Sequence, residues 1–113
     1  MTQQACDLTK KHCVPCEGGV PALGHDEIKH HLKTLSHWKF DEKKNTITRA
    51  LTFHNFYETM AFVNAIAWMA HQEDHHPDLA VGYNYCNLKY STHAINGLSE
   101  NDFICAAKVD NLL

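Results

Sequence analysis

Pro77 is the residue that most constrains the fold of this chain. It follows two adjacent histidines, His75 and His76, at the end of the longest helical pattern in the sequence. The residue before a proline is disfavoured in helical geometry. We therefore expect the helix that starts at Asn55 to end near Glu73 and a strand to follow. The histidine pair is predicted to lie at this junction between helix and strand.

Apolar periodicity predicts helices that alternate with hairpin-linked strands. Apolar residues at helical spacing mark the helices, and polar turn residues separate the two strands of each pair. The predicted helices cover residues 26–35, 55–73 and a last segment capped by Ser99, and the predicted strands cover residues 38–40, 47–53, 79–83 and 86–92. This order indicates a two-layer α+β fold, in which three helices pack on one face of a four-stranded antiparallel sheet.

The chain divides into an N-terminal arm over residues 1–23 and a domain over residues 24–113. The arm contains turn-forming residues but no sustained apolar period. On the long helix, the residues predicted to face the core are Phe56, Met60, Val63, Ala67 and Ala70.

Five cysteines, an odd number, favour reduced thiols over a disulfide framework. Cys13 and Cys16 form a Cys-x-x-Cys motif beside His12, which could hold zinc or take part in redox exchange. A four-ligand zinc site would need another pair of ligands, and only Cys6 and His25 lie nearby in sequence. We therefore expect reduced thiols on a loose arm.

Charge and hydropathy exclude several classes of function. The net charge is −3, so the chain lacks the basic surface typical of nucleic-acid binding. No apolar run approaches the roughly 20 residues of a membrane span, and the polar start of the chain is not a secretory signal. We expect a cytoplasmic protein that binds neither nucleic acid nor membranes. Asp78, Glu100 and Asp102 follow the histidines and argue against a polyphosphate substrate.

Three histidines are predicted to meet at one end of the sheet. A hairpin over residues 79–92 would bring His93 back towards His75 and His76. Imidazole exchanges its proton near neutral pH, so such a cluster suits proton transfer.

His71 lies four residues before His75, and this spacing also suits zinc if the helix continues that far. The run from His71 to His75 places its Glu one position away from the metalloprotease pattern. The alternative hypothesis is therefore a metal-binding protein that uses His71, His75, His76 and His93.

The spacing of these residues resembles the signature of the pterin-4a-carbinolamine dehydratase family. The similarity covers roughly residues 25–110, and the Cys-x-x-Cys motif followed by two glycines is similar to the arm of bacterial members. The matching positions are His71, His75, His76, Pro77, Tyr83, Ser91, Thr92, His93, Asp102 and the segment 97–103 around it.

The resemblance implies an enzyme that removes water from 4a-hydroxytetrahydropterin, the product left by aromatic amino acid hydroxylases. The product would be quinonoid dihydropterin, which is then recycled. Members use histidines that correspond to His75, His76 and His93, without a metal and with no cofactor besides the pterin substrate. Small members form homodimers or homotetramers. Animal relatives also act as transcriptional partners, so an interaction module is a further alternative.

The chemistry of the residues agrees with that reaction. Hydroxide is a poor leaving group, so an acid should protonate it while a base takes the proton from the neighbouring ring nitrogen. Imidazoles with a pKa near ~6.5 can do both at neutral pH. We predict that His75 and His93 form the acid/base pair and that His76 orients the pterin.

The remaining site residues are expected to surround these histidines. Predicted substrate contacts are Asp74, Ser91, Thr92, Glu73 and Tyr83, and predicted supporting residues are His71, Pro77 and Asp102. Asp102 is expected to cap the last helix together with Ser99.

Two positions depart from the pattern of animal members. His71 is often Glu there, and Glu73 is expected to supply part of that acidic character. Leu79 is often Trp there, and its side chain cannot stack on a pterin as an indole can.

Overall fold

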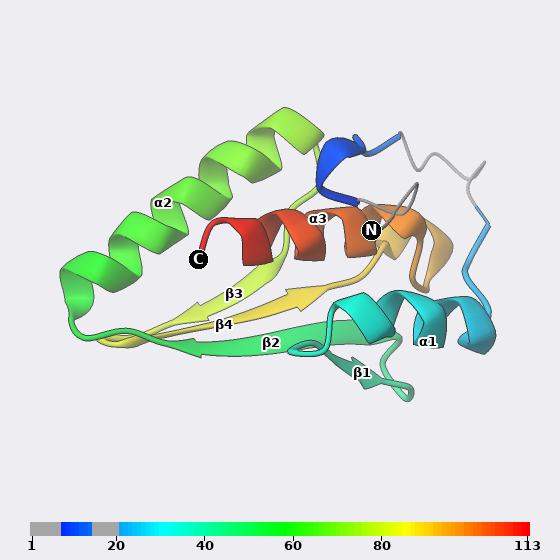
Figure 1. Ribbon diagram of the computed structural model, residues 1–113, viewed down its shortest axis with the longest axis horizontal. Helices are drawn as coiled ribbons and strands as arrows, with labels where there is room; N and C mark the ends of the chain where they lie inside the picture. Colours follow the sequence, from blue (N-terminus) through cyan, green and yellow to red (C-terminus); the bar gives the residue numbers. More distant parts are fainter. Residues whose placement is uncertain (1–7, 15–20) are drawn as a thin grey trace.

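One antiparallel sheet of four strands and three α-helices form the structure, a computed structural model that describes residues 8–14 and 21–113 (Figure 1). In chain order the elements are η2 (Leu8–Lys10), α1 (His25–Thr34), β1 (Lys39–Asp41), β2 (Thr46–Thr52), α2 (Phe56–Glu73), β3 (Asp78–Val81), β4 (Tyr85–Tyr90), η3 (His93–Ile95) and α3 (Glu100–Asn111). The predicted α+β class and element order are confirmed. No helix in these described ranges is long and apolar enough to span a bilayer.

The sheet has the strand order β1-β2-β4-β3, and every neighbouring pair is antiparallel. β3 begins directly after Pro77 and runs back along β4, with Asp78 opposite Lys89. The segment 91–93, which follows β4, therefore returns to the same end of the sheet as the segment 75–77.

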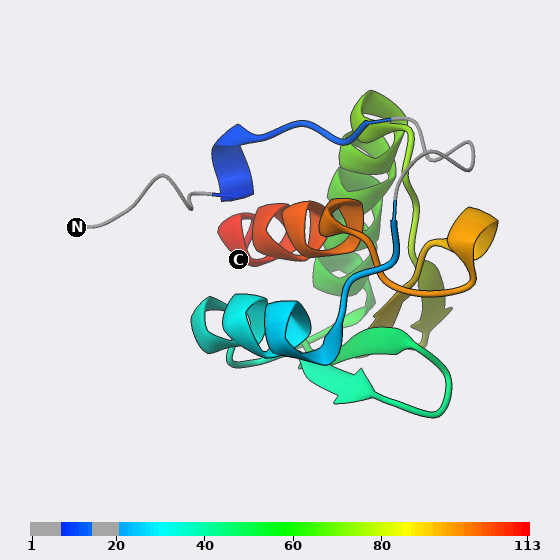
Figure 2. The ribbon, with the colours of Figure 1, turned by 90° about the vertical axis from the view of Figure 1, so that its right-hand side faces the viewer.

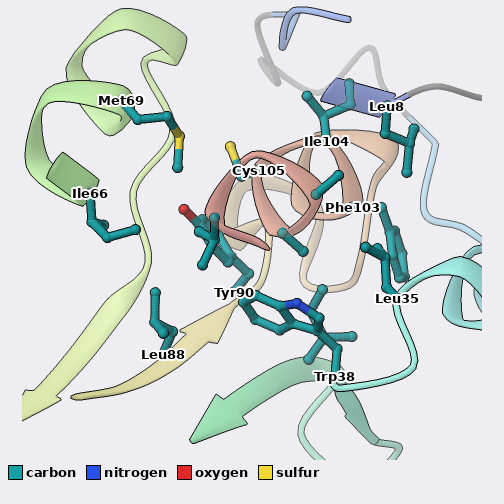
Figure 3. Packing of buried hydrophobic residues seen from close by; sticks show 14 of the residues in the cluster. Leu8, Leu35, Trp38, Ile66, Met69, Leu88, Tyr90, Phe103, Ile104 and Cys105 are labelled. Carbon is teal, nitrogen blue, oxygen red and sulfur yellow. The ribbon is translucent and has the colours of Figure 1, made fainter. Parts of the chain in front are cut away.

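All three helices cover one face of the sheet (Figures 1 and 2). Alternate residues of β4 point toward them, because successive side chains of a strand lie on opposite faces. Figure 3 shows this core, which joins the sheet to α2 and α3 and includes Ile66, Met69, Cys86, Leu88, Tyr90, Phe103, Ile104 and Cys105. Burial of each large apolar side chain contributes about 1.5–3 kcal/mol.

Helix α2 begins and ends where the sequence predicts. The side chain of Asn55 accepts a hydrogen bond from the backbone nitrogen of Glu58 at 2.9 Å and caps the start of the helix. The helix ends at Glu73 because Asp74 adopts the left-handed conformation, with a φ of 52°. Pro77 then prevents the chain from resuming the helix.

The prediction of which face of α2 is buried is wrong. The buried stripe is displaced by about one residue position from the predicted one. The side chains that face the core are Thr59, Phe62, Ile66, Met69 and Glu73. Phe56, by contrast, is 46% exposed. Apolar residues occur on more than one side of α2, so their spacing alone does not determine which stripe meets the sheet. The outer side keeps Tyr57 and Trp68 exposed.

Residues 8–14 of the predicted arm lie across α3 (Figure 2). Leu8 is 5% exposed and belongs to the hydrophobic core. Nζ of Lys108 on α3 donates a hydrogen bond to the carbonyl oxygen of Thr9 at 3.0 Å. The expectation of a loose arm is therefore wrong for residues 8–14.

A charged side chain interrupts the helix-facing side of β2, and α3 supplies its partner. Arg49 forms an ion pair with Oδ1 of Asp110. Nε1 of Trp38 donates a hydrogen bond to the same oxygen at 2.9 Å. The C-terminal part of α3 is thereby tied to the sheet.

Candidate active site

The candidate site is organised around an ion pair between His75 and Asp102. Nε2 of His75 lies 2.7 Å from Oδ1 of Asp102, whose side chain is completely buried. The His75 ring stacks on the ring of Tyr90, with the centroids 5.7 Å apart and the planes within 10° of parallel. A carboxylate on one side and a phenol ring on the other therefore fix the orientation of this imidazole.

The second carboxylate oxygen of Asp102 joins two further segments. Oδ2 accepts hydrogen bonds from Oγ1 of Thr92 at 2.8 Å and from the backbone nitrogen of Ser99 at 3.0 Å. The hydroxyls of Thr92 and Ser99 lie 2.8 Å apart. The predicted capping of α3 by Ser99 and Asp102 is confirmed. The contact between Asp102 and His75 was missed, although the spacing of the family signature includes both residues.

The environment of His75 favours its protonated form. Burial on its own would lower the pKa of His75, but the hydrogen bond and negative charge of Asp102 raise it above its ordinary value. Among the described residues, Nδ1 of this ring has no hydrogen-bond partner. His75 can therefore hold a proton on Nδ1 while Asp102 binds Nε2.

His76 is exposed and lies beside the buried Pro77. Its Nδ1 is 3.3 Å from the carbonyl oxygen of Pro77. A carbonyl oxygen only accepts, so Nδ1 carries the hydrogen in this contact and Nε2 is left facing outward. The arrangement leaves the outer nitrogen of His76 able to contact a ligand.

His93 borders a pocket of about 230 Å³ on the sheet face opposite the helices. Ser91 and Thr92 line the same pocket, so three consecutive predicted site residues meet there. Thr92 also connects the pocket wall to Asp102, and Asp102 connects it to His75. The other lining residues are Lys44, Asn45, Thr46, Asp78, Lys89, Asn96 and Gly97.

Sequence reasoning did not find the pocket residues contributed by the turn between β1 and β2. Lys44 and Asn45 carry no motif, and only the pairing of β2 with β4 brings them next to His93. Of the acids used to argue against a polyphosphate, Asp78 alone lines the pocket. Glu100 does not line it and instead forms an ion pair with Lys11 at 3.0 Å.

Three predicted site residues lie outside this arrangement. Tyr83 is 64% exposed in the turn between β3 and β4, at the far end of the hairpin from Asp78. His71 is exposed on α2, where its ring contacts Trp68 with the centroids 5.6 Å apart. The third, Glu73, faces the arm.

Glu73 is buried and binds the arm through both carboxylate oxygens. Oε1 accepts a hydrogen bond from the backbone nitrogen of Cys13 at 2.8 Å, and Oε2 lies 3.0 Å from Nδ1 of His12. Nζ of Lys108 is 3.5 Å from Oε2. Burial would raise the pKa of Glu73, but these hydrogen bonds and the positive charge of Lys108 lower it. The structure thus gives Glu73 the task of fastening the arm.

The spacing argument for zinc at His71 and His75 fails, because α2 ends at Glu73 and the two side chains do not share a helical face. Among the described residues there is no group of three or more His, Cys, Asp or Glu side chains that could hold a metal ion. Asp74 is exposed at the left-handed turn that follows α2.

Comparisons with known proteins find relatives over almost the whole chain. The family model described as pterin 4 alpha carbinolamine dehydratase matches residues 21–112. A protein of Nitrosomonas eutropha is 61% identical over 109 residues, which are 96% of this chain and 95% of that protein. A protein of Legionella pneumophila (strain Lens) is 59% identical and covers 95% of this chain and 96% of its own length. Both are named, provisionally, as pterin-4-alpha-carbinolamine dehydratases.

A solved structure has the same architecture. The transcriptional coactivator/pterin dehydratase from Brucella melitensis superposes with a TM-score of 0.77 at 30% sequence identity. The superposition covers 80% of this chain and 97% of that one. The matched family segment contains all three predicted catalytic histidines, together with Asp102.

Proposed function

The chain belongs to the pterin 4 alpha carbinolamine dehydratase family, and from this membership we propose that it removes water from a 4a-hydroxytetrahydropterin to give quinonoid dihydropterin. The observation that carries the proposal is the hydrogen bond between His75 and Asp102, which lies inside the family-matched segment. It supplies a half-buried, oriented imidazole with a raised pKa, which Asp102 and Thr92 connect to the wall of the pocket. An oriented acid of this kind is what acid catalysis of dehydration requires.

In the proposed mechanism His75 is the acid. Its raised pKa keeps a larger fraction of the ring protonated at neutral pH. The proton on Nδ1 passes to the departing 4a-hydroxyl, which leaves as water. The hydrogen bond to Asp102 stabilises the imidazolium before the transfer. Residues that tune a pKa toward the working pH are typical of acid/base sites.

His93 is the base in this mechanism. The ring nitrogen next to the reacting carbon loses its proton to His93 as the carbon–nitrogen double bond forms. His76 lies close in sequence to His75, and its free Nε2 orients the pterin by accepting or donating one hydrogen bond. Proton transfer and positioning are sufficient for this reaction, and each supplies a recognised part of the rate enhancement.

The pterin ring is proposed to extend from the pocket beside His93 toward His75, so that both imidazoles reach the same ring. Ser91 and Asn96 there offer a hydroxyl and an amide that can pair with the polar edge of a pterin. Leu79 offers no aromatic surface, so binding is proposed to rely on these hydrogen bonds more than on stacking.

We also propose that the substrate comes from a pterin-dependent aromatic amino acid hydroxylase in the cytoplasm. A coupled assay with such a hydroxylase would measure whether the chain increases steady-state turnover by removing the carbinolamine. No increase under conditions in which carbinolamine decay limits turnover would reject this link.

A homodimer or homotetramer is proposed from the apolar side chains that one copy leaves exposed. On α2, Tyr57 and Trp68 are 81% and 63% exposed, and the edge strand β3 exposes Leu79 and Val81. Exposed apolar patches and open strand edges are typical of interfaces. Size-exclusion chromatography with light scattering measures the assembly, and a monomer at micromolar concentration would reject it.

The direct test of the proposed activity uses freshly generated 4a-hydroxytetrahydropterin. The absorbance change of its dehydration is followed with and without protein, before and after treatment of the protein with a chelator. We expect catalysis that the chelator does not reduce. Loss of activity on chelation, with recovery on adding zinc, would instead support the metal-binding alternative.

A further inference from the structure

The thiols of Cys13 and Cys105 lie in contact, close to the backbone of His75. Sγ of Cys13 is 3.5 Å from Sγ of Cys105, although 92 positions separate the two residues in the chain. Cys105 belongs to the core on α3, whereas Cys13 is half-buried on the arm. Sγ of Cys105 also lies 3.9 Å from the carbonyl oxygen of His75. Neither thiol takes part in the proposed dehydration.

The backbone on both sides of the Cys13 side chain is held in place. The nitrogen of Cys13 donates to Oε1 of Glu73 at 2.8 Å. The next residue, Val14, exchanges two hydrogen bonds with the side chain of Asn101, at 3.1 and 2.7 Å. These contacts direct the Cys13 side chain toward α3. The two sulfurs are therefore close together because the arm is docked.

We propose that Cys13 and Cys105 form a redox-active dithiol, which a small disulfide of the glutathione class oxidises to an intramolecular disulfide. A protein disulfide requires the sulfurs to approach to about 2.05 Å. From their separation of 3.5 Å the two sulfurs must approach by about 1.5 Å more, which requires rotation of the side chains or a small shift of the arm. Cys13 offers the first point of attack because it is the more accessible of the two thiols.

The exchange proceeds in two steps that balance. The thiolate of Cys13 attacks one sulfur of the oxidant and releases one equivalent of small thiol. The thiol of Cys105 then loses its proton and attacks the Cys13 sulfur of the mixed disulfide, which releases the second equivalent. Two protein thiols are oxidised and one small disulfide is reduced to two thiols. The hydrogen bond with Cys105 and burial raise the pKa of Cys13, so the first step should be slow at neutral pH and should accelerate as the pH rises.

The disulfide would convert a docked arm into a covalently fastened one. It would close a loop that spans most of the chain, and long loops lose the most unfolded-state freedom on cross-linking. The oxidised protein should therefore melt at a higher temperature than the reduced protein. Reduction with dithiothreitol should return the melting temperature to its original value.

Cys16 provides the competing partner, because it completes a Cys-x-x-Cys motif with Cys13. A disulfide within that motif would close only a short loop and would leave Cys105 reduced. The two possibilities therefore differ both in the cross-linked peptides and in the change of melting temperature.

The test is oxidation of the full-length protein with oxidised glutathione, followed by alkylation, proteolysis and mass spectrometry under non-reducing conditions. We expect a Cys13–Cys105 cross-linked peptide and a melting temperature raised by several degrees. The Cys16→Ser variant should give the same peptide and the same shift. Cys86→Ser, which removes another buried thiol, is the matched control and should also keep both.

The Cys13→Ser variant should lose both the cross-link and the shift while remaining folded, since its side chain is half-buried at the surface of α3. A wild-type protein whose Cys13 pairs with Cys16 would overturn the proposal. So would a protein that carries only mixed disulfides with glutathione, or one that keeps Cys13 and Cys105 reduced at an oxidant concentration that modifies exposed thiols.

Discussion

Nε2 of His75 and Oδ1 of Asp102 lie 2.7 Å apart, although 27 positions separate the two residues in the chain. His75 follows the end of α2, and Asp102 lies in the first turn of α3, so the pair connects two helices across the end of the sheet. The same carboxylate caps α3 and binds Thr92 next to His93. One buried acid therefore fixes the relative positions of two predicted catalytic histidines.

Replacement of this acid should change both the protonation of His75 and the rate of dehydration. In Asp102→Asn, burial remains while the negative charge is lost, so the pKa of His75 should fall from above to below its ordinary value of 6.5. If His75 is the acid, turnover at neutral pH should fall on the order of 100-fold, within the range typical of general acid–base catalysis. NMR titration of the imidazole resonances measures the first effect, and the dehydration assay measures the second.

Asp78→Asn is the matched control, because Asp78 is exposed at the pocket and makes no ion pair with His75. It should leave the pKa of His75 raised. An Asp102→Asn protein that is folded and keeps a raised pKa at His75 would contradict the pairing.

The His75–Asp102 pair should make folding stability depend on pH. The pKa of His75 is raised in the folded state, so its contribution to the free energy of unfolding is fully present below the unfolded value of 6.5. That contribution is lost as the pH rises through the folded pKa. The difference in unfolding free energy between wild type and His75→Gln should therefore shrink as the pH rises above about 6.5.

Urea denaturation at several pH values measures this difference, with His37→Gln as the control at an exposed histidine. The wild-type and control curves should run parallel. A gap between wild type and His75→Gln that widens with rising pH would show that the folded pKa is lowered instead.

His93→Ala tests the assignment of the base. His93 is exposed, so its removal should leave the free energy of unfolding within about 0.5 kcal/mol of wild type. Dehydration should nevertheless slow by about 100-fold or more. His37→Ala removes an imidazole of similar exposure away from the pocket and should keep wild-type activity. Full turnover in His93→Ala would remove His93 from the mechanism.

Glu73→Gln should loosen the docked arm. The variant loses the ionised partner of His12 and Lys108, and its amide has only one oxygen that can accept a hydrogen bond. Trypsin should then cleave after Lys10 or Lys11 about fivefold faster or more, since a weakening of ~1 kcal/mol increases the open population by that factor.

The arm contact should also respond to pH in wild type. The pKa of Glu73 is lowered in the folded state, so its contribution to the free energy of arm docking is present above about pH 4.5 and is lost as the pH falls through the folded value.

Glu42→Gln is the control for Glu73→Gln, because Glu42 is an exposed acid in the turn between β1 and β2. Trypsin should cleave this control at the wild-type rate. Equal cleavage rates for Glu73→Gln and wild type would show that Glu73 does not fasten the arm.

Much of the fold could be predicted because local signals agree with one another. Asn55 and Pro77 set the limits of α2, and the alternating pattern of β4 gave the hairpin that returns the chain to His93. Ser99 with Asp102 marked the start of α3. Each of these signals depends on residues within a few positions of one another.

The features that could not be predicted depend on contacts between distant segments. The buried face of α2 was missed because the helix carries apolar residues on several sides. Only packing against the sheet selects the stripe that contains Ile66. The docking of residues 8–14 depends on Glu73 and Asn101, to which no periodic pattern points. Likewise, the pocket residue Lys44 meets His93 only through the pairing of β2 with β4.

The central claim is that this chain dehydrates a pterin carbinolamine with His75 as the acid. The measurement that tests it most directly is the rate of dehydration of freshly made 4a-hydroxytetrahydropterin, compared between wild type and a folded His75→Ala variant at equal concentration. We predict that wild type accelerates the reaction well above the buffer rate and that the variant loses about 100-fold or more of that acceleration. A wild-type rate equal to that of buffer, or a His75→Ala rate equal to that of wild type, would contradict the claim.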